Sequence, residues 1–181
     1  MSTAKYLFDS DSLIIAKNIH YSPDFCPAFW DWLVTGNQKS TFFTIDRVAD
    51  ELKNGNEEDY LRNFIELHID TFALKTKTDQ KCLAKYIEIQ QWANSVWTNG
   101  KNKSKTAKAL DKFAKEKTAD PWLVAYASAH GYHIVSNEES AIMSQTSVKL
   151  PDVANAFGVK VVKLHEVLNL HCEKNFSFKL A

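Results

Sequence analysis

Short apolar runs alternate along this chain with longer segments in which apolar residues recur at helical spacing. Such alternation predicts an α/β fold, with a parallel sheet and helices on both of its faces. The five predicted strands are residues 4–8, 41–45, 71–74, 132–135 and 160–164. Five helices are predicted over residues 23–34, 46–54, 79–98, 120–131 and 164–170. Two more are predicted to begin at Ser12 and near Glu58, and another lies within the lysine-rich stretch that follows Gly100.

Local signals indicate where several of these helices begin and end. Gly36 is expected to stop the aromatic-rich helix, and Gly131 to close the helix that begins at Asp120. Asp46 is expected to cap a helix that ends before Gly55. The 181 residues contain no repeat or linker, so we expect one domain spanning residues 1–181, whose last ~8 residues fray.

The first predicted strand carries the strongest sign of function. A short apolar run, residues 6–8 (Tyr-Leu-Phe), ends abruptly in Asp9-Ser10-Asp11-Ser12. In open α/β sheets, ligands bind at the carboxyl ends of the strands. A carboxylate at this edge predicts either a metal ligand or a group that starts a reaction.

Four acidic residues fall at comparable places in the predicted layout. Asp9 ends the first strand, Glu51 lies in the helix after the second, Asp120 opens the helix before the fourth, and Glu138 follows the fourth. Converging carboxylates repel one another, and a divalent cation removes that cost. Carboxylate oxygens suit Mg²⁺ or Mn²⁺, which can activate water and stabilise charge on a phosphoryl group.

Most of these residues also have a structural interpretation. Asp120 before Pro121 is a good helix cap, and Glu51 could be a surface residue. Asp11 could cap the first helix, and Glu138 could be a first-turn charge favoured by the helix dipole. Asp9 has no such simple alternative, because it directly ends a buried strand.

Composition narrows the class of protein. Hydrophobic residues make up 45% of the chain, which argues against disorder, and no apolar run approaches the ~20 residues that span a bilayer. The three scattered cysteines form no Cys-x-x-Cys pair and fit a reducing cytoplasm. Lysines crowd residues 101–117 although the net charge is zero. They are either a solvated surface or an RNA phosphate-binding patch, for which the candidates are Lys101, Lys103, Lys105 and Lys108.

The acidic motifs resemble those of PIN-domain nucleases of the VapC type. Asp9 follows an apolar strand, Glu51 lies within residues 48–52 (Val-Ala-Asp-Glu-Leu), and Asp120 opens residues 120–127 (Asp-Pro-Trp-Leu-Val-Ala-Tyr-Ala). Residues 134–138 (Ile-Val-Ser-Asn-Glu) resemble the fourth motif of these nucleases. The order and spacing of the motifs suit the whole chain.

Three further segments narrow the resemblance. Residues 29–33 (Phe-Trp-Asp-Trp-Leu), 120–123 and 149–153 (Lys-Leu-Pro-Asp-Val) are similar to a bacterial and archaeal PIN-like family first catalogued as uncharacterised, DUF4411. Its members resemble toxins of type II toxin–antitoxin pairs. The implied partners are an RNA substrate and a cognate antitoxin protein, with a homodimer as an option and no membrane.

The resemblance implies a three-layer α/β/α sandwich with a five-stranded parallel sheet in the order 3-2-1-4-5. It also implies a cytoplasmic endoribonuclease that hydrolyses RNA by water activated on Mg²⁺ or Mn²⁺. The implied catalytic and metal-binding residues are Asp9, Glu51, Asp120 and Glu138. The polar residues expected to support them are Ser10, Asp11 and Ser136.

The chain departs from the family pattern at two positions. Asp11 stands where the first motif usually has Asn or Ser, and Glu138 stands where the fourth usually has Asp. The fourth ligand could therefore be Glu138, the adjacent Glu139, or Asp152. Asp152 could equally be a helix cap.

Two other functions remain open on the sequence. Asp9 and Asp11 resemble the Asp-x-Asp nucleophile motif of haloacid-dehalogenase phosphatases, although the expected later Gly-Asp motif is missing. Alternatively, the domain could keep a PIN-like fold as a binding module without turnover. Phosphatase activity that depends on Asp11 would identify the first, and failure to bind a divalent metal would favour the second.

Overall fold

Five parallel strands form one sheet in the order β3-β2-β1-β4-β5. The protein is represented by a computed structural model in which residues 4–98 and 105–180 are described. The strands are β1 (Tyr6–Phe8), β2 (Phe42–Ile45), β3 (Ala73–Leu74), β4 (His133–Val135) and β5 (Val161–Val162). Each strand lies inside a predicted one, and the predicted α/β fold and strand order are confirmed.

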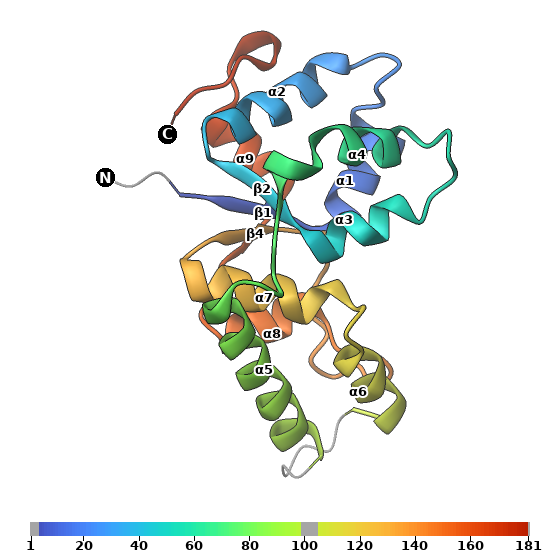
Figure 1. Ribbon diagram of the computed structural model, residues 1–181, viewed down its shortest axis with the longest axis vertical. Coiled ribbons are helices and arrows are strands. Elements are labelled where there is room, and N and C mark those ends of the chain that lie inside the picture. Colours follow the sequence, from blue (N-terminus) through green and yellow to red (C-terminus); the bar gives the residue numbers. More distant parts are fainter. Residues whose placement is uncertain (1–3, 99–104, 181) are drawn as a thin grey trace.

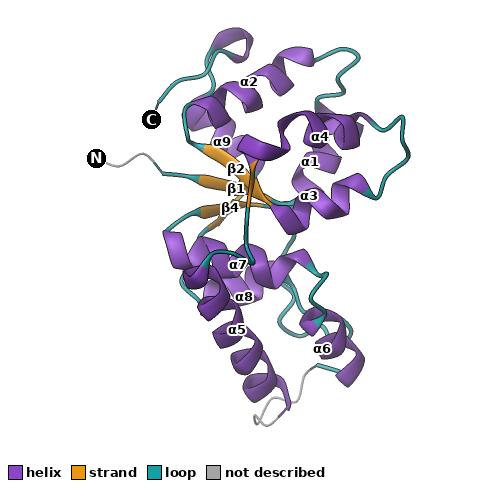
Figure 2. Cartoon of the chain, viewed as in Figure 1, coloured by secondary structure: helices purple, strands orange, loops and turns teal. Residues whose placement is uncertain are grey.

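Helices lie on both sides of the sheet (Figures 1 and 2). One group contains α1 (Ser10–Ile15), η1 (Ala16–His20), α2 (Pro27–Gln38), α3 (Asp46–Lys53), α4 (Tyr60–Phe72) and α9 (Leu164–His171). The other contains α5 (Gln80–Thr98), α6 (Ala107–Ala114), α7 (Ala119–His130) and α8 (Leu150–Ala156). The fold is therefore the predicted α/β/α sandwich. No helix of the described residues is long and apolar enough to cross a bilayer.

The central strand explains why the sheet needs helices on both sides. Tyr6, Leu7 and Phe8 of β1 are all buried, as expected for a parallel strand covered on both faces. Phe42 of β2 packs edge to face against both Tyr6 and Phe8, with ring centroids 6.0 and 5.4 Å apart. These contacts hold β1 at the centre of the core. They thereby fix the position of Asp9, the residue that follows the strand.

The helix was predicted to stop near Gly36, and α2 ends two residues later, at Gln38. Gly36 itself is buried inside the helix, where a Cβ would collide with the Phe42 ring. The glycine thus permits a close approach of helix and strand rather than ending the helix. Gly131 does close α7, with a left-handed φ of 71°, as predicted.

Asp46 is not the cap of α3, which was the prediction, because Ile45 occupies that position. The Asp46 carboxylate instead accepts hydrogen bonds from the Thr76 hydroxyl at 2.7 Å and the Thr76 amide at 3.1 Å. It therefore fastens the chain leaving β3 to the start of α3. Its role depends on a residue 30 positions away, which local sequence signals do not reveal.

The last residues, for which fraying was expected, are held against the domain as far as Lys179. Cys172 and Phe178 form an antiparallel bridge, followed by a hydrogen bond from the Lys179 amide to the His171 carbonyl at 3.0 Å. Phe178 also stacks on the buried His171 ring. The aromatic residues of this segment provide the buried surface that holds it.

Candidate active site

Asp9 stands at the carboxyl end of β1 and is 4% exposed. Its amide donates to the Val135 carbonyl at 3.0 Å, which joins the ends of β1 and β4. Its carboxylate caps α1 by accepting from the Ser10 amide at 2.7 Å, and it accepts from the Ser136 hydroxyl at 3.0 Å. The central strand thus delivers a carboxylate to the sheet edge at which parallel folds bind ligands.

Glu51 projects from α3 toward the same region. Its carboxylate accepts from the Ser10 hydroxyl at 3.1 Å and from the Ala119 amide at 3.2 Å. Glu51 is partly buried, so its alternative role as a simple surface residue is not borne out. It connects the start of α1 to the start of α7.

Asp120 lies in the first turn of α7, but it does not cap this helix. The cap position belongs to Thr118, and no described residue donates a hydrogen bond to the Asp120 carboxylate. The capping interpretation of Asp120 is therefore wrong. Burial raises the pKa of Asp120 to about 7, and the nearby carboxylates of Glu138, Glu51 and Asp11 add to this shift, against a smaller opposite effect of Lys149.

The pKa of Asp9 is also held well above its usual range. Burial is the main cause, and the charges of Asp120 and Asp11 add to it, while the hydrogen bonds from Ser136 and Ser10 act in the opposite direction. The charge of Asp120 raises the pKa of Asp9 because the two carboxylates share a poorly solvated space. The sequence prediction that these distant carboxylates come together is thus met in the structure.

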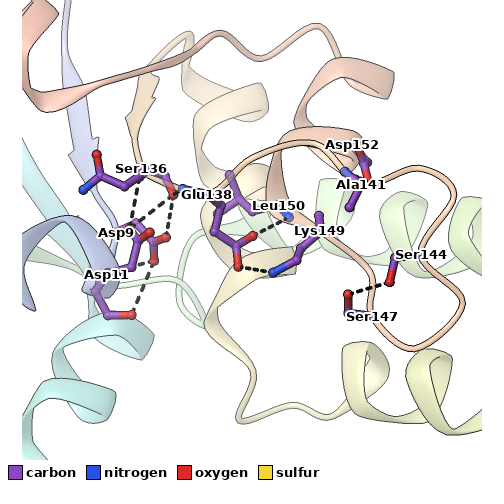
Figure 3. A network of polar contacts seen from close by, with 12 residues as sticks. Asp9, Asp11, Ser136, Glu138, Ala141, Ser144, Ser147, Lys149, Leu150 and Asp152 are labelled. Carbon is purple, nitrogen blue, oxygen red and sulfur yellow. Dashed lines mark hydrogen bonds and ion pairs between the residues drawn. The ribbon is translucent and has the colours of Figure 1, made fainter. Parts of the chain in front are cut away.

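Ser136 organises the end of β4, as Figure 3 shows. Besides Asp9, its hydroxyl lies 3.2 Å from the Asp11 carboxylate and accepts from the Glu138 amide at 3.1 Å. Asp11 also accepts from the Asn137 amide at 3.3 Å. Asp11 therefore binds the loop that follows β4 rather than capping α1, which Asp9 does.

Glu138 is held by the lysine of the 149–153 motif. Its two carboxylate oxygens accept from the Lys149 ammonium at 3.0 Å and from the Leu150 amide at 3.1 Å (Figure 3). Lys149 had no assigned role in the sequence analysis, although it lay within a recognised motif. The adjacent Glu139 points to solvent, with its side chain 84% exposed, and pairs with Lys163. Of these two acids, Glu138 is the one placed beside Asp120.

Asp152 supports the loop over residues 136–149. Its carboxylate accepts from the Ser140 hydroxyl at 2.5 Å and from the Ala141 amide at 3.3 Å. It does not cap α8, whose cap position is Lys149. Figure 3 shows Asp152 well apart from Asp9 and Asp11, so its contacts favour a role in loop structure over metal ligation.

Of the four predicted phosphate-binding lysines, the two that the structure describes have different surroundings. Lys105 is 7% exposed, and its ammonium donates to the carbonyls of Ala141, Ile142 and Ser144 at 3.3, 3.2 and 2.7 Å. It is therefore a poor candidate for RNA contact, because its donors serve the loop. Lys108 is exposed on α6, as a solvated helix face requires. Lys101 and Lys103 lie outside the described residues.

The oxygen donors at this edge fit a hard divalent cation such as Mg²⁺ or Mn²⁺. The buried Asp9 and the partly buried Asp120, both with raised pKa values, lie where a positive charge would stabilise their ionised forms. In the arrangement of the described side chains, however, no three Asp, Glu, His or Cys residues lie close enough together to hold a metal. Glu51 and Glu138 instead hold hydrogen bonds from the Ala119 amide and the Lys149 ammonium.

Comparison with known proteins now identifies the family. The family model described as "Domain of unknown function (DUF4411)" matches residues 6–175. The chain belongs to this family. No curated protein sequence matches the DUF4411 chain significantly.

Among solved structures, the chain is similar to one described as VapBC2 from Rickettsia felis bound to a DNA fragment from the VapBC2 promoter. The TM-score is 0.52 at 12% sequence identity, and the match covers 87% of this chain and 97% of the other. At this identity the likeness shows the fold, which is PIN-like.

Proposed function

We propose that this protein is a metal-dependent endoribonuclease and the toxin of a type II toxin–antitoxin pair. The observation that carries the proposal is the meeting of Asp9 and Asp120 at the carboxyl edge of the sheet, with their pKa values raised by burial and by neighbouring carboxylates. Such crowding costs stability, and perturbed acids in a recess are typical of functional sites. The PIN-like fold and the motifs around these acids support the same reaction class.

In this proposal Asp9, Asp120, Glu51 and Glu138 hold Mg²⁺ or Mn²⁺. When bound, the metal supplies a Lewis acid for the phosphoryl group and lowers the pKa of a water molecule. The residues of the chain orient these ligands: Ser136 fixes Asp9, Ser10 fixes Glu51, and Lys149 fixes Glu138. Any of these carboxylates that remains unbound to metal can accept the proton of the attacking water.

Cleavage of single-stranded RNA by the purified protein tests this proposal. We expect cleavage with Mn²⁺, none with a chelator, and a loss of about 10²-fold or more in Asp9→Asn and in Asp120→Asn, since metal catalysis contributes several kcal/mol. Asp70→Asn is the matched control, because Asp70 is exposed at the end of α4. Equal cleavage by the wild type and both site variants would reject the proposal.

A non-catalytic binding module is the second candidate. It is favoured by the lack of a ready three-ligand group among the described residues. A metal that binds the native state must raise its melting temperature. A domain that neither gains stability from Mn²⁺ nor cleaves RNA, but folds normally, would be such a module.

The phosphatase alternative is weaker than either. It needs Asp11 as a free acid and base, but the Asp11 carboxylate is engaged by Ser136 and Asn137. The loop over residues 136–149 also contains no aspartate. A small aryl phosphate tests it directly, and hydrolysis that disappears in Asp11→Asn would restore it.

The toxin role has its own test in cells. Expression of the wild-type chain alone should arrest growth, whereas Asp9→Asn expressed to the same level should not. Co-expression of the protein encoded beside it should relieve the arrest if that protein is the antitoxin. Unaffected growth with verified expression of an RNA-cleaving chain would reject the toxin role and leave the nuclease.

A further inference from the structure

A basic cleft lies against the outer side of Glu51. Its volume is about 360 Å³, and it is lined by Arg47, Asp50, Glu51, Lys53, Asn54 and Lys117. Four of these residues, at positions 47, 50, 51 and 54, share one face of α3 through their three- and four-residue spacing. Three cations in this cleft face only two carboxylates, one of which is Glu51 itself. We call it the α3 cleft.

Arg47 is positioned rigidly at this cleft. Its guanidinium lies over the Trp122 ring, 5.3 Å from the ring centre, and Trp122 is itself stacked on Tyr86. Its ion pair with Glu116 is long, at 3.4 Å, and Glu116 is shared with Lys77. The Arg47 Nε is buried and has no acceptor among the described residues. A planar guanidinium held in this way suits a phosphate better than the partner it has.

A second, smaller cleft lies on the other side of the carboxylates. Its volume is about 100 Å³, and its polar lining includes Lys112, Thr118, Asp120, Glu138 and Lys149. Lys112 is exposed on α6, whereas Lys149 is paired with Glu138. We call it the α7 cleft.

The two clefts are joined by residues 117–120, which lead into the first turn of α7. Lys117 lines the α3 cleft, Thr118 and Asp120 line the α7 cleft, and the Ala119 amide between them donates to Glu51. Three of the four proposed catalytic carboxylates therefore line these two clefts, and each cleft also contains cations. A polyanionic strand running from one cleft to the other would meet positive charge before and after the reacting position.

We propose that these clefts bind successive phosphates of single-stranded RNA on the two sides of the cleaved bond. Lys53 and Lys117, with Arg47, hold the strand on the Glu51 side, and Lys112 holds it on the Glu138 side. This inference rests on the proposed function for the position of the cleaved bond. It assigns phosphate contact to Lys112 and Lys117, at the end of the lysine-rich stretch.

The salt dependence of RNA binding tests the proposal. Binding of a fluorescein-labelled single-stranded RNA is measured by anisotropy between 50 and 300 mM salt, roughly the range over which phosphate contacts dominate. The Asp9→Asn background prevents cleavage during the measurement. Each lost phosphate contact lowers the slope of log K against log salt by about 0.7 for single strands. We expect a decrease of about 1.4 for Lys53→Ala with Lys117→Ala, and about 0.7 for Lys112→Ala.

The matched control is Lys39→Ala with Lys160→Ala. Both lysines are exposed, and they precede β2 and β5, so they lie at the opposite edge of the parallel sheet. An unchanged slope in this control, with flatter slopes in the cleft variants of unchanged melting temperature, supports the proposal. Equal slopes in the wild-type and cleft chains, or no RNA binding at all, overturn it.

Cleavage measured in parallel separates this proposal from the proposed function. If the wild type cleaves RNA but the cleft variants keep its salt slope, the clefts are wrongly assigned and the nuclease stands. If the cleft variants flatten the slope but the wild type with Mn²⁺ does not cleave, the phosphate contacts stand and the nuclease does not.

Discussion

Replacing Asp120 with asparagine should stabilise the metal-free protein, although it removes a residue from the proposed active site. The side chain keeps its shape in this variant but can no longer ionise. Ionised Asp120 is disfavoured in the folded chain by burial and by the charges of Glu138, Glu51 and Asp11. The unfolded chain has no such crowding, so the wild type loses stability whenever Asp120 is charged.

The size of the gain follows from the pKa of Asp120. The difference between the ordinary value of 3.8 and about 7 in the folded chain corresponds to roughly 4 kcal/mol, at about 1.4 kcal/mol per pKa unit. Because the side chain is only partly buried, we take about 2–4 kcal/mol as the expected gain. Loss of a favourable first-turn charge in α7 subtracts about 0.3–1 kcal/mol.

The effect of Asp120→Asn on stability should depend on pH. The pKa of Asp120 is raised in the folded chain, so the destabilisation caused by its charge is absent below its unfolded-state pKa near 4. It grows as the pH rises from about 4 to 7 and is complete above 7. Asp120→Asn should therefore raise the free energy of unfolding at pH 8 and change it little at pH 4.

Urea denaturation of both proteins in a chelator, at pH 4 and pH 8, provides the measurement. Asp70→Asn, at an exposed position of α4, serves as the control and should change stability by no more than about 0.5 kcal/mol at either pH. An Asp120→Asn effect that is the same at pH 4 and pH 8, or that is destabilising at pH 8, would refute the reasoning about crowded carboxylates.

Three further predictions concern the surroundings of the site. Glu138→Gln should slow RNA cleavage by about 10–100-fold, whereas Glu139→Gln should not, since Glu139 faces solvent; equal rates in the two variants would remove Glu138 from the site. Lys105→Met should lower the free energy of unfolding by about 2 kcal/mol or more in urea, because it deprives three loop carbonyls of their donor. No loss would show that water replaces the ammonium. Gly36→Ala should cost about 1–3 kcal/mol through collision with the Phe42 ring, and a thermal melt like that of the wild type would mean that the ring moves aside.

The sheet could be predicted from sequence because its strands are short, continuous apolar runs. Residues 6–8 and 42–45 are buried throughout, so their pattern does not depend on distant contacts. Asp9, which ends the first run, was equally visible. Asp120 opens the helix that leads back to the start of β4, so its place at the same carboxyl edge followed from the alternation of helices and strands.

Roles that depend on long-range contacts could not be predicted. Asp46 had the features of a helix cap, but its partner is Thr76. Gly36 had the features of a helix stop, but it makes room for Phe42. In both cases the sequence marks the residue as structurally important, but its role is set by a contact with a residue in another segment of the chain.

The loop over residues 136–149 was the least predictable part of the site. It has no regular secondary structure, and its shape comes from Lys105 and Asp152, which lie on either side of it in the sequence. From the sequence, Lys105 could belong to a solvated surface or to a phosphate patch, and Asp152 could be a metal ligand or a helix cap. Only burial and hydrogen bonding distinguish a structural charge from a binding one.

The central claim is that Asp9 and Asp120 belong to one divalent metal site. Calorimetric titration of the metal-free protein with Mn²⁺ tests it most directly, with Asp9→Asn and Asp70→Asn as the paired variants. The account predicts that the wild type and Asp70→Asn bind Mn²⁺ alike, and that Asp9→Asn binds at least about tenfold more weakly while remaining folded. Equal Mn²⁺ affinity in all three proteins would contradict it.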